Sequence, residues 1–205
     1  MKLYFSPGTC ALAAHISLLE GGLKFEQVRT DLKTKKTADG RDYLQVNPKG
    51  YVPALELDDG SVLTENVAVL QYIGDRNPGA GLVPPAGTME RYRLDEWLAF
   101  INSEIHKSFS PFFNPATPDA WKEILRGKLV QRLDYVQGVL GTREFLMGGQ
   151  FTVADAYLFT VLRWTKLANL SLQQWPAIQA YWEKIKQRPR VAEALAAEGL
   201  SGGKH

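Results

Sequence analysis

The sequence predicts two unlike domains, a small mixed α/β domain over residues 1–80 and an all-helical domain over residues 88–205. Three observations lead to this expectation. Strand-like and helix-like spacing of apolar residues alternate in the first part, whereas only helical spacing follows it. Residues 77–87 are rich in proline and glycine, which is typical of a connector. All five tryptophans lie at or after Trp97, so the two parts also differ in composition.

The elements of the first domain follow the order β-α-β, a long loop with room for a short helix, and then β-β-α. Pro7-Gly8 closes the first strand, Gly21-Gly22 ends the first helix, and Asp58-Asp59-Gly60 is a strong hairpin signal. In chain order we expect strand 2–5, helix 9–20, strand 25–30, strands 52–57 and 61–63, and helix 64–75. This order describes a small mixed sheet with helices packed on it.

The second domain shows apolar residues at helical spacing throughout. The expected helices are 90–109, 121–140, 153–167 and 177–188. One further feature is local: Thr152 precedes a helical run and Asp155 follows three residues later, which is the pattern of a capping box. We expect both residues to be structural, so that their loss harms folding before catalysis.

Composition excludes several classes of function. The chain of 205 residues carries a net charge of +2, which supplies no basic surface for nucleic acid or an anionic membrane. Its single cysteine rules out an internal disulfide framework and a thiolate metal cluster, so no metal is expected. We find neither a secretory signal nor a long apolar window, and a free thiol persists best in a reducing cytoplasm, where we expect the protein.

Cys10 is the most informative single residue. It follows a strand and the turn Pro7-Gly8 and should lie in the first turn of a helix, where backbone amides and the helix dipole favour the thiolate. A Cys-x-x-Cys redox pair would need a second sulfur at position 13, where Ala13 stands. A covalent partner would therefore come from outside the chain, as a small soluble thiol. The alternative is a small buried apolar residue without reactivity.

Three motifs occur in order along the chain, and a helical domain follows them: KLYFSPGTCALA, NPKGYVPALELDDG and LTENVAVLQYI. Together they resemble the bacterial cytosolic glutathione S-transferases, and Cys10 with Glu104-Ile105-His106-Lys107 resembles their beta class in particular. The resemblance covers essentially the whole chain. It implies a thioredoxin-like N-terminal domain (βαβαββα), an all-helical C-terminal domain, reduced glutathione as co-substrate, and a homodimer.

The same resemblance implies a glutathione site in the first domain. Cys10 would be catalytic, and the binding residues beside it would be Lys35, Val52, Pro53, Glu65 and Asn66. In the family the proline is cis, and the residue before it makes backbone hydrogen bonds to the cysteinyl unit. Position 66 is more often Ser or Gly, so Asn66 is a departure. Taken without the family, Glu65 would be an ordinary helix cap and Lys35 a solvated cation.

In the second domain the resemblance implies contacts from the first long helix. His106 would act beside the cysteine as the second catalytic residue, and Ser103, Glu104 and Lys107 would also approach glutathione. Ala99 replaces an asparagine that is frequent in the family. Trp164 and Phe109 are candidates for an apolar pocket for the second substrate. A lone histidine and aromatic residues at helical spacing are more often structural, which is the alternative for each.

These residues lead to the expectation of a glutathione transferase that conjugates reduced glutathione to small, electrophilic, hydrophobic compounds. Cys10 would either donate a hydrogen bond to the glutathione thiolate or form a mixed disulfide with it. The second possibility gives one alternative function, a glutathione-dependent thiol-disulfide oxidoreductase or reductive dehalogenase. Another alternative is a non-catalytic interaction protein with the same fold.

Overall fold

The computed structural model describes residues 1–202. Its contacts divide the chain into two compact units, which are taken separately below. Among the described residues, the first holds Met1–Val83 together with residues 189–202, and the second holds Pro84–Arg188. Within residues 1–202 no helix combines the length and the hydropathy that a membrane span requires.

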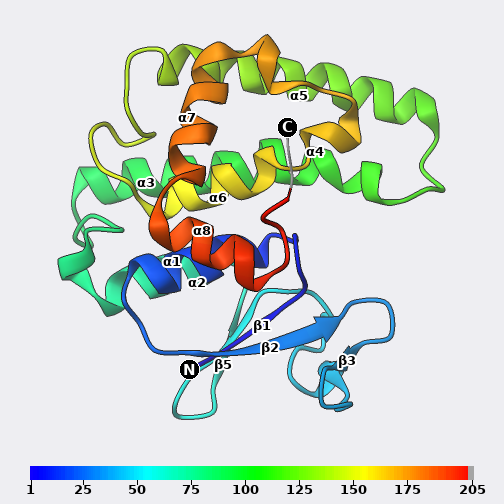
Figure 1. Cartoon of the computed structure of the whole chain (residues 1–205), viewed down its shortest axis with the longest axis vertical. Helices are drawn as coiled ribbons and strands as arrows, with labels where there is room; N and C mark the ends of the chain where they lie inside the picture. Colours follow the sequence, from blue (N-terminus) through cyan, green and yellow to red (C-terminus); the bar gives the residue numbers. More distant parts are fainter. Residues whose placement is uncertain (203–205) are drawn as a thin grey trace. The chain divides into compact units, whose positions relative to one another are not determined.

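The first unit is built on one mixed sheet of five strands in the order β3-β2-β1-β4-β5. Figure 1 labels β1, β2, β3 and β5 of this sheet. β1 pairs in parallel with β2, and the pairs β1–β4, β2–β3 and β4–β5 are antiparallel. The elements of this sheet and its helices are β1 (Lys2–Phe5), α1 (Ala11–Glu20), β2 (Glu26–Asp31), β3 (Lys36–Thr37), β4 (Ala54–Glu56), β5 (Val62–Thr64) and α2 (Asn66–Arg76). β3 was not expected, and the predicted short helix is the 3-10 turn η1 (Tyr43–Gln45).

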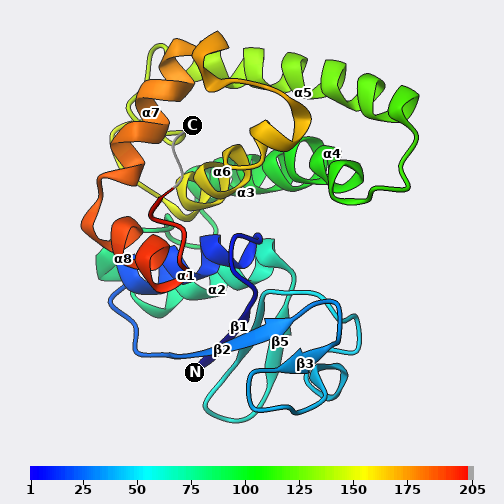
Figure 2. The ribbon, with the colours of Figure 1, turned by 45° about the vertical axis from the view of Figure 1, so that its right-hand side comes forward.

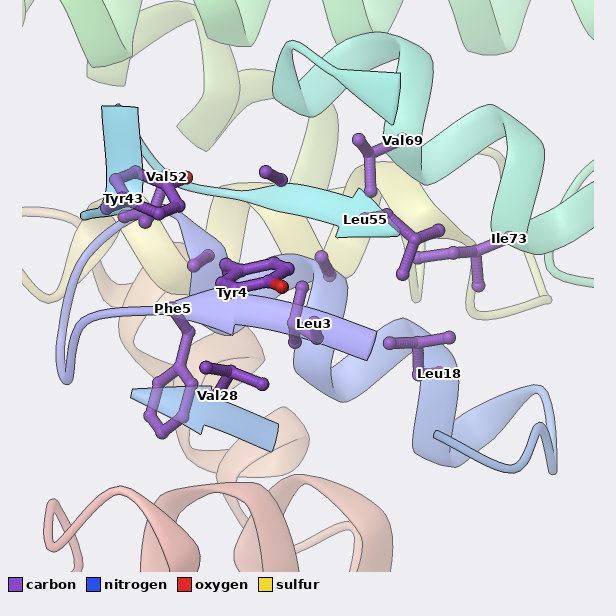
Figure 3. Close-up of a cluster of buried hydrophobic side chains, with 13 residues drawn as sticks. Leu3, Tyr4, Phe5, Leu18, Val28, Tyr43, Val52, Leu55, Val69 and Ile73 are labelled. Atoms are coloured by element: carbon purple, nitrogen blue, oxygen red, sulfur yellow. The ribbon is translucent and has the colours of Figure 1, made fainter. Parts of the chain in front are cut away.

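The core of this unit gathers around the central strand β1. Leu3 and Tyr4 are fully buried, and Leu18 of α1 and Ile73 of α2 belong to the same apolar cluster (Figure 3). Burial of such side chains contributes roughly 1.5–3 kcal/mol each, which holds the helices on the sheet. The close fit of α2 is clearest at Gly74, where a Cβ atom would stand 2.3 Å from Val83 Cγ1.

A final helix, α8 (Pro189–Ala197), also belongs to the first unit, where it packs against α1 (Figure 2). Its buried apolar residues are Val191, Ala194 and Leu195. Just beyond it, the Glu198 carboxylate lies 3.0 Å from His15 Nδ1 and accepts a 2.9 Å hydrogen bond from the Gly8 amide. The expected all-helical domain, 88–205, included this segment, and its apolar stripe and buried polar pair instead place it with the first unit.

The second unit is helical, as expected. It comprises α3 (Met89–Phe100), the π-helical segment η3 (Ile101–His106), α4 (Lys107–Phe109), α5 (Asp119–Leu140), α6 (Val153–Leu162) and α7 (Pro176–Lys186), with 3-10 turns between them (Figure 1). All ten residues of α6 are buried, so this helix lies at the centre of the unit. The predicted helix 153–167 ends earlier, at Leu162, and gives way to a turn and the 3-10 segment η5 (Thr165–Ala168).

Candidate functional site

Cys10 is the residue that caps the start of α1. The chain reaches it through a turn in which Gly8 has a φ of +73°, a backbone conformation that suits glycine. The half-buried thiol donates a 3.3 Å hydrogen bond to the carbonyl oxygen of Val52. The first predicted catalytic residue is therefore in direct contact with a predicted glutathione-binding residue.

The peptide bond between Val52 and Pro53 is cis, as the resemblance implied. The loop before it is fixed through the carbonyl of Tyr51, which accepts hydrogen bonds from Tyr43 Oη at 2.6 Å and Asn47 Nδ2 at 2.7 Å. Two buried or half-buried donors on one carbonyl leave this loop little freedom. The backbone of Val52 is thus held in place immediately before β4.

Lys35 lies on the same loop system, as a residue with a positive φ of 57°. Its ammonium group donates a 2.8 Å hydrogen bond to the Gly50 carbonyl and lies 5.8 Å from the centre of the Tyr51 ring. The neighbouring cation Lys49 forms an ion pair with Glu65. Lys35 and Lys49 therefore bring two positive charges to the segment that precedes Val52.

Glu65 and Asn66 form the start of α2, and both are unusual. Glu65 caps the helix with a φ of +70° and is largely exposed. Asn66 is only 7% exposed, yet neither atom of its side-chain amide has a hydrogen-bond partner among the described residues. A buried amide nearly always has partners, so this pair of free donor and acceptor groups is what a ligand head group would use.

His106 is the last residue of the π-helical segment η3. Its Nδ1 atom lies 2.6 Å from Tyr157 Oη, and Tyr157 in turn donates a 3.0 Å hydrogen bond to Asn102 Oδ1. The Trp164 ring lies 5.0 Å from the His106 ring, centre to centre. Burial, with a smaller contribution from the adjacent cation Lys107, lowers the pKa of His106 to about 4. The imidazole is therefore neutral near pH 7 and can accept a proton.

Of the other residues predicted on this helix, Ser103 and Glu104 form hydrogen bonds or ion pairs within the second unit, and Lys107 is exposed. Ser103 Oγ donates a 2.9 Å hydrogen bond to the carbonyl of Ala99. Glu104 bonds Arg132 at 2.8 Å and Lys128 at 3.2 Å, and these hydrogen bonds lower the pKa of the carboxyl group. Lys107 is exposed, so its charge remains available to an anion.

The aromatic residues predicted for a substrate pocket differ from one another. Phe109 is fully buried and packs edge-on against Trp164, at 6.0 Å between ring centres. Trp164 is 6% exposed and also contacts the ring of Phe113, which is half exposed. Phe109 thus has the surroundings of a core residue, whereas Trp164 stands between His106 and an exposed aromatic ring.

The capping box expected at Thr152 and Asp155 is present at the start of α6. Asp155 accepts hydrogen bonds from the Thr152 amide at 2.8 Å and the Thr152 hydroxyl at 2.9 Å. Its second oxygen accepts from the Leu146 amide at 2.9 Å and from Tyr181 Oη at 3.0 Å. A carboxylate with four donors and no exposed surface is a structural element of the helix start.

Two features of the second unit were not predicted. One is the pairing of His106 with Tyr157 and Asn102, for which the only sequence signal is that Asn102 stands four residues before His106. The other is a groove of about 1070 Å³ along α3 and α5, which contains the mutually packed rings of Trp97, Phe100 and Tyr135. Over the described part of the chain, no cluster of three or more His, Cys, Asp or Glu side chains has the arrangement of a metal site.

Comparison with known proteins decides the family. Residues 1–75 match the model of the glutathione S-transferase N-terminal domain, and residues 100–189 match that of the C-terminal domain. The sequence is 47% identical to glutathione S-transferase GstA of Escherichia coli O157:H7 over 200 residues, which is 98% of this chain and 100% of the relative. The chain belongs to the glutathione S-transferase family.

Solved structures of glutathione S-transferases agree with this assignment. BphK, described as a bacterial GST and solved as a ternary complex, superposes with a TM-score of 0.96 at 54% identity, covering 98% of this chain and 100% of that one. The bacterial beta class enzyme of Sphingomonas chungbukensis gives a TM-score of 0.94 at 46% identity, with 98% and 100% coverage. The chain is a glutathione transferase of the bacterial beta class type, with a thioredoxin-like first domain, and the two alternative functions have less support.

Proposed function

We propose that this transferase joins reduced glutathione to small, electrophilic, hydrophobic compounds, with Cys10 and His106 as its catalytic residues. In the reaction the sulfur of glutathione forms a bond to the electrophilic carbon, the leaving group departs with the bonding electron pair, and the thiol proton is released. The observation that carries the proposal is the contact of the Cys10 thiol with the Val52 carbonyl, 3.3 Å away. This carbonyl belongs to the backbone unit that would pair with the cysteinyl residue of glutathione.

The binding residues proposed for glutathione match its three parts. Its γ-glutamyl end carries an ammonium and a carboxylate, which suit the Glu65 carboxylate and the unpartnered amide of Asn66 at the start of α2. Val52 and Pro53 would align its cysteinyl unit, and the Lys35 ammonium would balance its glycine carboxylate. Ser103, Glu104 and Lys107 are proposed as further contacts, Lys107 through its exposed positive charge.

The two catalytic residues would have different roles, His106 toward the thiol proton and Cys10 toward the thiolate. His106 is neutral near pH 7, because burial lowers its pKa to about 4, so it has an unprotonated ring nitrogen toward which the thiol proton can move. Cys10, at the start of α1, then donates a hydrogen bond to the thiolate that results. Trp164 would contribute an apolar surface to the electrophile, in keeping with its position next to His106.

The test compares wild-type protein with Cys10→Ala and His106→Gln. We expect all three proteins to bind immobilised glutathione. We expect His106→Gln to lower kcat/KM for a model aryl halide by roughly 100-fold, at the lower end of the range for a general base. Cys10→Ala should retain conjugation, reduced by roughly 10-fold, if the thiol only donates a hydrogen bond. Failure of the wild type to bind glutathione or to conjugate it would overturn the proposal.

A homodimer in the cytoplasm is a further part of the proposal. The groove along α3 and α5 supports self-association, because it combines packed aromatic rings with charges of both signs, among them Arg93, Glu96 and Arg132. The single free cysteine supports a reducing compartment. Sedimentation equilibrium of the purified protein measures the oligomeric state, and a mass of one chain, 22.9 kDa, would contradict the dimer.

A further inference from the structure

We propose that Tyr157 and Asn102 are positioning residues that hold His106 as the Nδ1–H tautomer, so that Nε2 is the atom that accepts a proton. The inference rests on the proposed catalytic role of His106 and adds the two residues that select its reactive nitrogen. The three side chains form a chain of hydrogen bonds within the second unit, 2.6 Å from His106 Nδ1 to Tyr157 Oη and 3.0 Å from Tyr157 Oη to Asn102 Oδ1.

The direction of the hydrogen bonds follows from the number of protons. A tyrosine hydroxyl carries one proton, and here it is donated to the amide oxygen of Asn102. The bond between the hydroxyl and His106 Nδ1 then needs its proton from the imidazole. Nδ1 is therefore protonated and Nε2 carries the lone pair.

The packing around the ring favours a single orientation. Tyr157 belongs to α6, in which every residue is buried. The surrounding packing therefore holds the Tyr157 hydroxyl in one position. The rings of His106 and Tyr157 meet edge to face at 88°, with 5.8 Å between their centres. Trp164 lies 5.0 Å from the imidazole centre and restricts rotation further. Asn102 and His106 both belong to η3, four residues apart, so one segment supplies the acceptor and the imidazole.

The tautomer decides what the imidazole can do. A free imidazole prefers the proton on Nε2, and in that form Nε2 would donate a hydrogen bond toward a substrate and could not accept its proton. The hydrogen bonds of Tyr157 and Asn102 reverse this preference and make Nε2 an acceptor. A neutral imidazole whose second nitrogen is already bonded is the usual arrangement of a histidine base.

Nitrogen-15 NMR of the imidazole rings tests the inference directly. The chain has three histidines, and the signals of His106 are those that disappear in His106→Gln. At pH 7 we expect the shift of a protonated nitrogen at Nδ1 and of an unprotonated one at Nε2. Asn102→Leu removes the final acceptor, so the hydroxyl proton turns to Nδ1 and the tautomer changes to Nε2–H. Asn102→Asp keeps an acceptor and should retain Nδ1–H.

Tyr157→Phe and a matched control complete the experiment. Tyr157→Phe should also return His106 to Nε2–H, whereas Tyr181→Phe, which removes another buried hydroxyl from the same unit, should leave the tautomer and kcat/KM unchanged. We expect Tyr157→Phe and Asn102→Leu to lower kcat/KM roughly 10-fold, less than loss of the base itself. The NMR result is independent of catalysis, so an active His106→Gln would refute the proposed role of His106 without touching the tautomer.

Three results would overturn the inference. The first is a wild-type spectrum with the proton on Nε2. The second is retention of Nδ1–H in Tyr157→Phe or Asn102→Leu. The third is an equal change of tautomer in Tyr181→Phe, which would show a general loss of packing instead of a specific hydrogen bond.

Discussion

At the scale of single residues, two unfavourable features stand side by side at the start of α2: a buried amide without partners among residues 1–202 and a positive φ. A buried amide without partners costs about 1–3 kcal/mol, and a non-glycine residue at positive φ costs a similar amount. Asn66 carries the first penalty and Glu65, next to it, carries the second. A ligand that supplies a donor and an acceptor would remove the first penalty, which is why Asn66 supports the glutathione proposal.

Burial also governs the charge of His106. Its pKa falls from the ordinary 6.5 to about 4, mainly because the charged form loses its hydration, and Lys107 adds repulsion. In the unfolded chain the imidazole regains its ordinary pKa. The unfolded state therefore binds a proton between these two values while the folded state does not, and stability falls as the pH falls.

This linkage gives a prediction for His106→Gln. The difference between the two pKa values corresponds to about 3 kcal/mol, fully present above pH 6.5 and lost as the pH approaches 4. Urea unfolding at a series of pH values should show wild-type stability falling by that amount relative to the variant, whose Gln side chain does not titrate. Parallel pH curves for the two proteins would contradict the prediction.

At the scale of elements, glycines in helices have opposite roles in the two units. Gly74 of α2 faces Val83, whose Cγ1, Cγ2 and Cβ atoms would lie 2.3, 2.8 and 3.1 Å from an added Cβ. Gly127 of α5 has nothing within 4 Å of such an atom. The first glycine allows close packing, and the second only lowers the helix propensity of its segment.

Alanine at these two positions should therefore change stability in opposite directions. We expect Gly74→Ala to lower the free energy of unfolding by about 1–3 kcal/mol, because the methyl group overpacks the contact with Val83. Gly127→Ala should raise it by roughly 0.5–1 kcal/mol through helix propensity alone. Urea denaturation measures both, and destabilisation of equal size by the two changes would exclude packing as the cause.

Elements with a clear period or stop signal were predictable from the sequence. The first strand and helix, the hairpin at Asp58-Asp59-Gly60, and the helices expected at 121–140 and 177–188 appear within two residues of their expected bounds. The helix expected at 90–109 is divided into α3, η3 and α4, and the one expected at 153–167 ends at Leu162. β3 has only two residues, Lys36–Thr37, so it shows no period. The π-helical segment η3 was also not predictable, because its apolar spacing is compatible with an ordinary helix.

The candidate site was predictable only where a residue type and a motif coincide. Cys10 and Val52-Pro53 stand in a recognisable context, and the structure brings the thiol and the Val52 carbonyl together. Tyr157 had no such context, because a tyrosine in an apolar helix has the pattern of a core residue. Its link to His106 spans 51 residues of sequence and exists only through tertiary packing.

At the scale of the whole molecule, α8 and the residues just after it belong to the unit that also holds the N-terminal strand β1. Glu198 and His15 are 6% and 1% exposed, and they join the segment after α8 to α1. The other oxygen of Glu198 accepts the hydrogen bond of the Gly8 amide, two residues before Cys10. One buried carboxylate, that of Glu198, thus bonds His15, which lies 183 residues away in the sequence. The same carboxylate accepts the hydrogen bond of the Gly8 amide in the turn that leads to Cys10.

Replacement of the Glu198 carboxylate should lower the free energy of unfolding far more than loss of an exposed carboxylate would. Glu198→Ala leaves His15 Nδ1 without its partner in a site closed to water, although Nε2 still lies 2.9 Å from Gln27 Nε2, and we expect a loss of roughly 3 kcal/mol in the free energy of unfolding. His15→Ala and the double variant complete a double-mutant cycle. Its coupling free energy should reach about 1–3 kcal/mol, because the side chains share one hydrogen bond.

Glu193→Ala is the matched control on α8: its ion pair with Arg190 is half exposed, so its loss should cost no more than about 1 kcal/mol. Faster hydrogen exchange at the Gly8 amide in Glu198→Ala alone would locate the effect at the turn before Cys10, whereas equal losses in the two glutamate variants would contradict it.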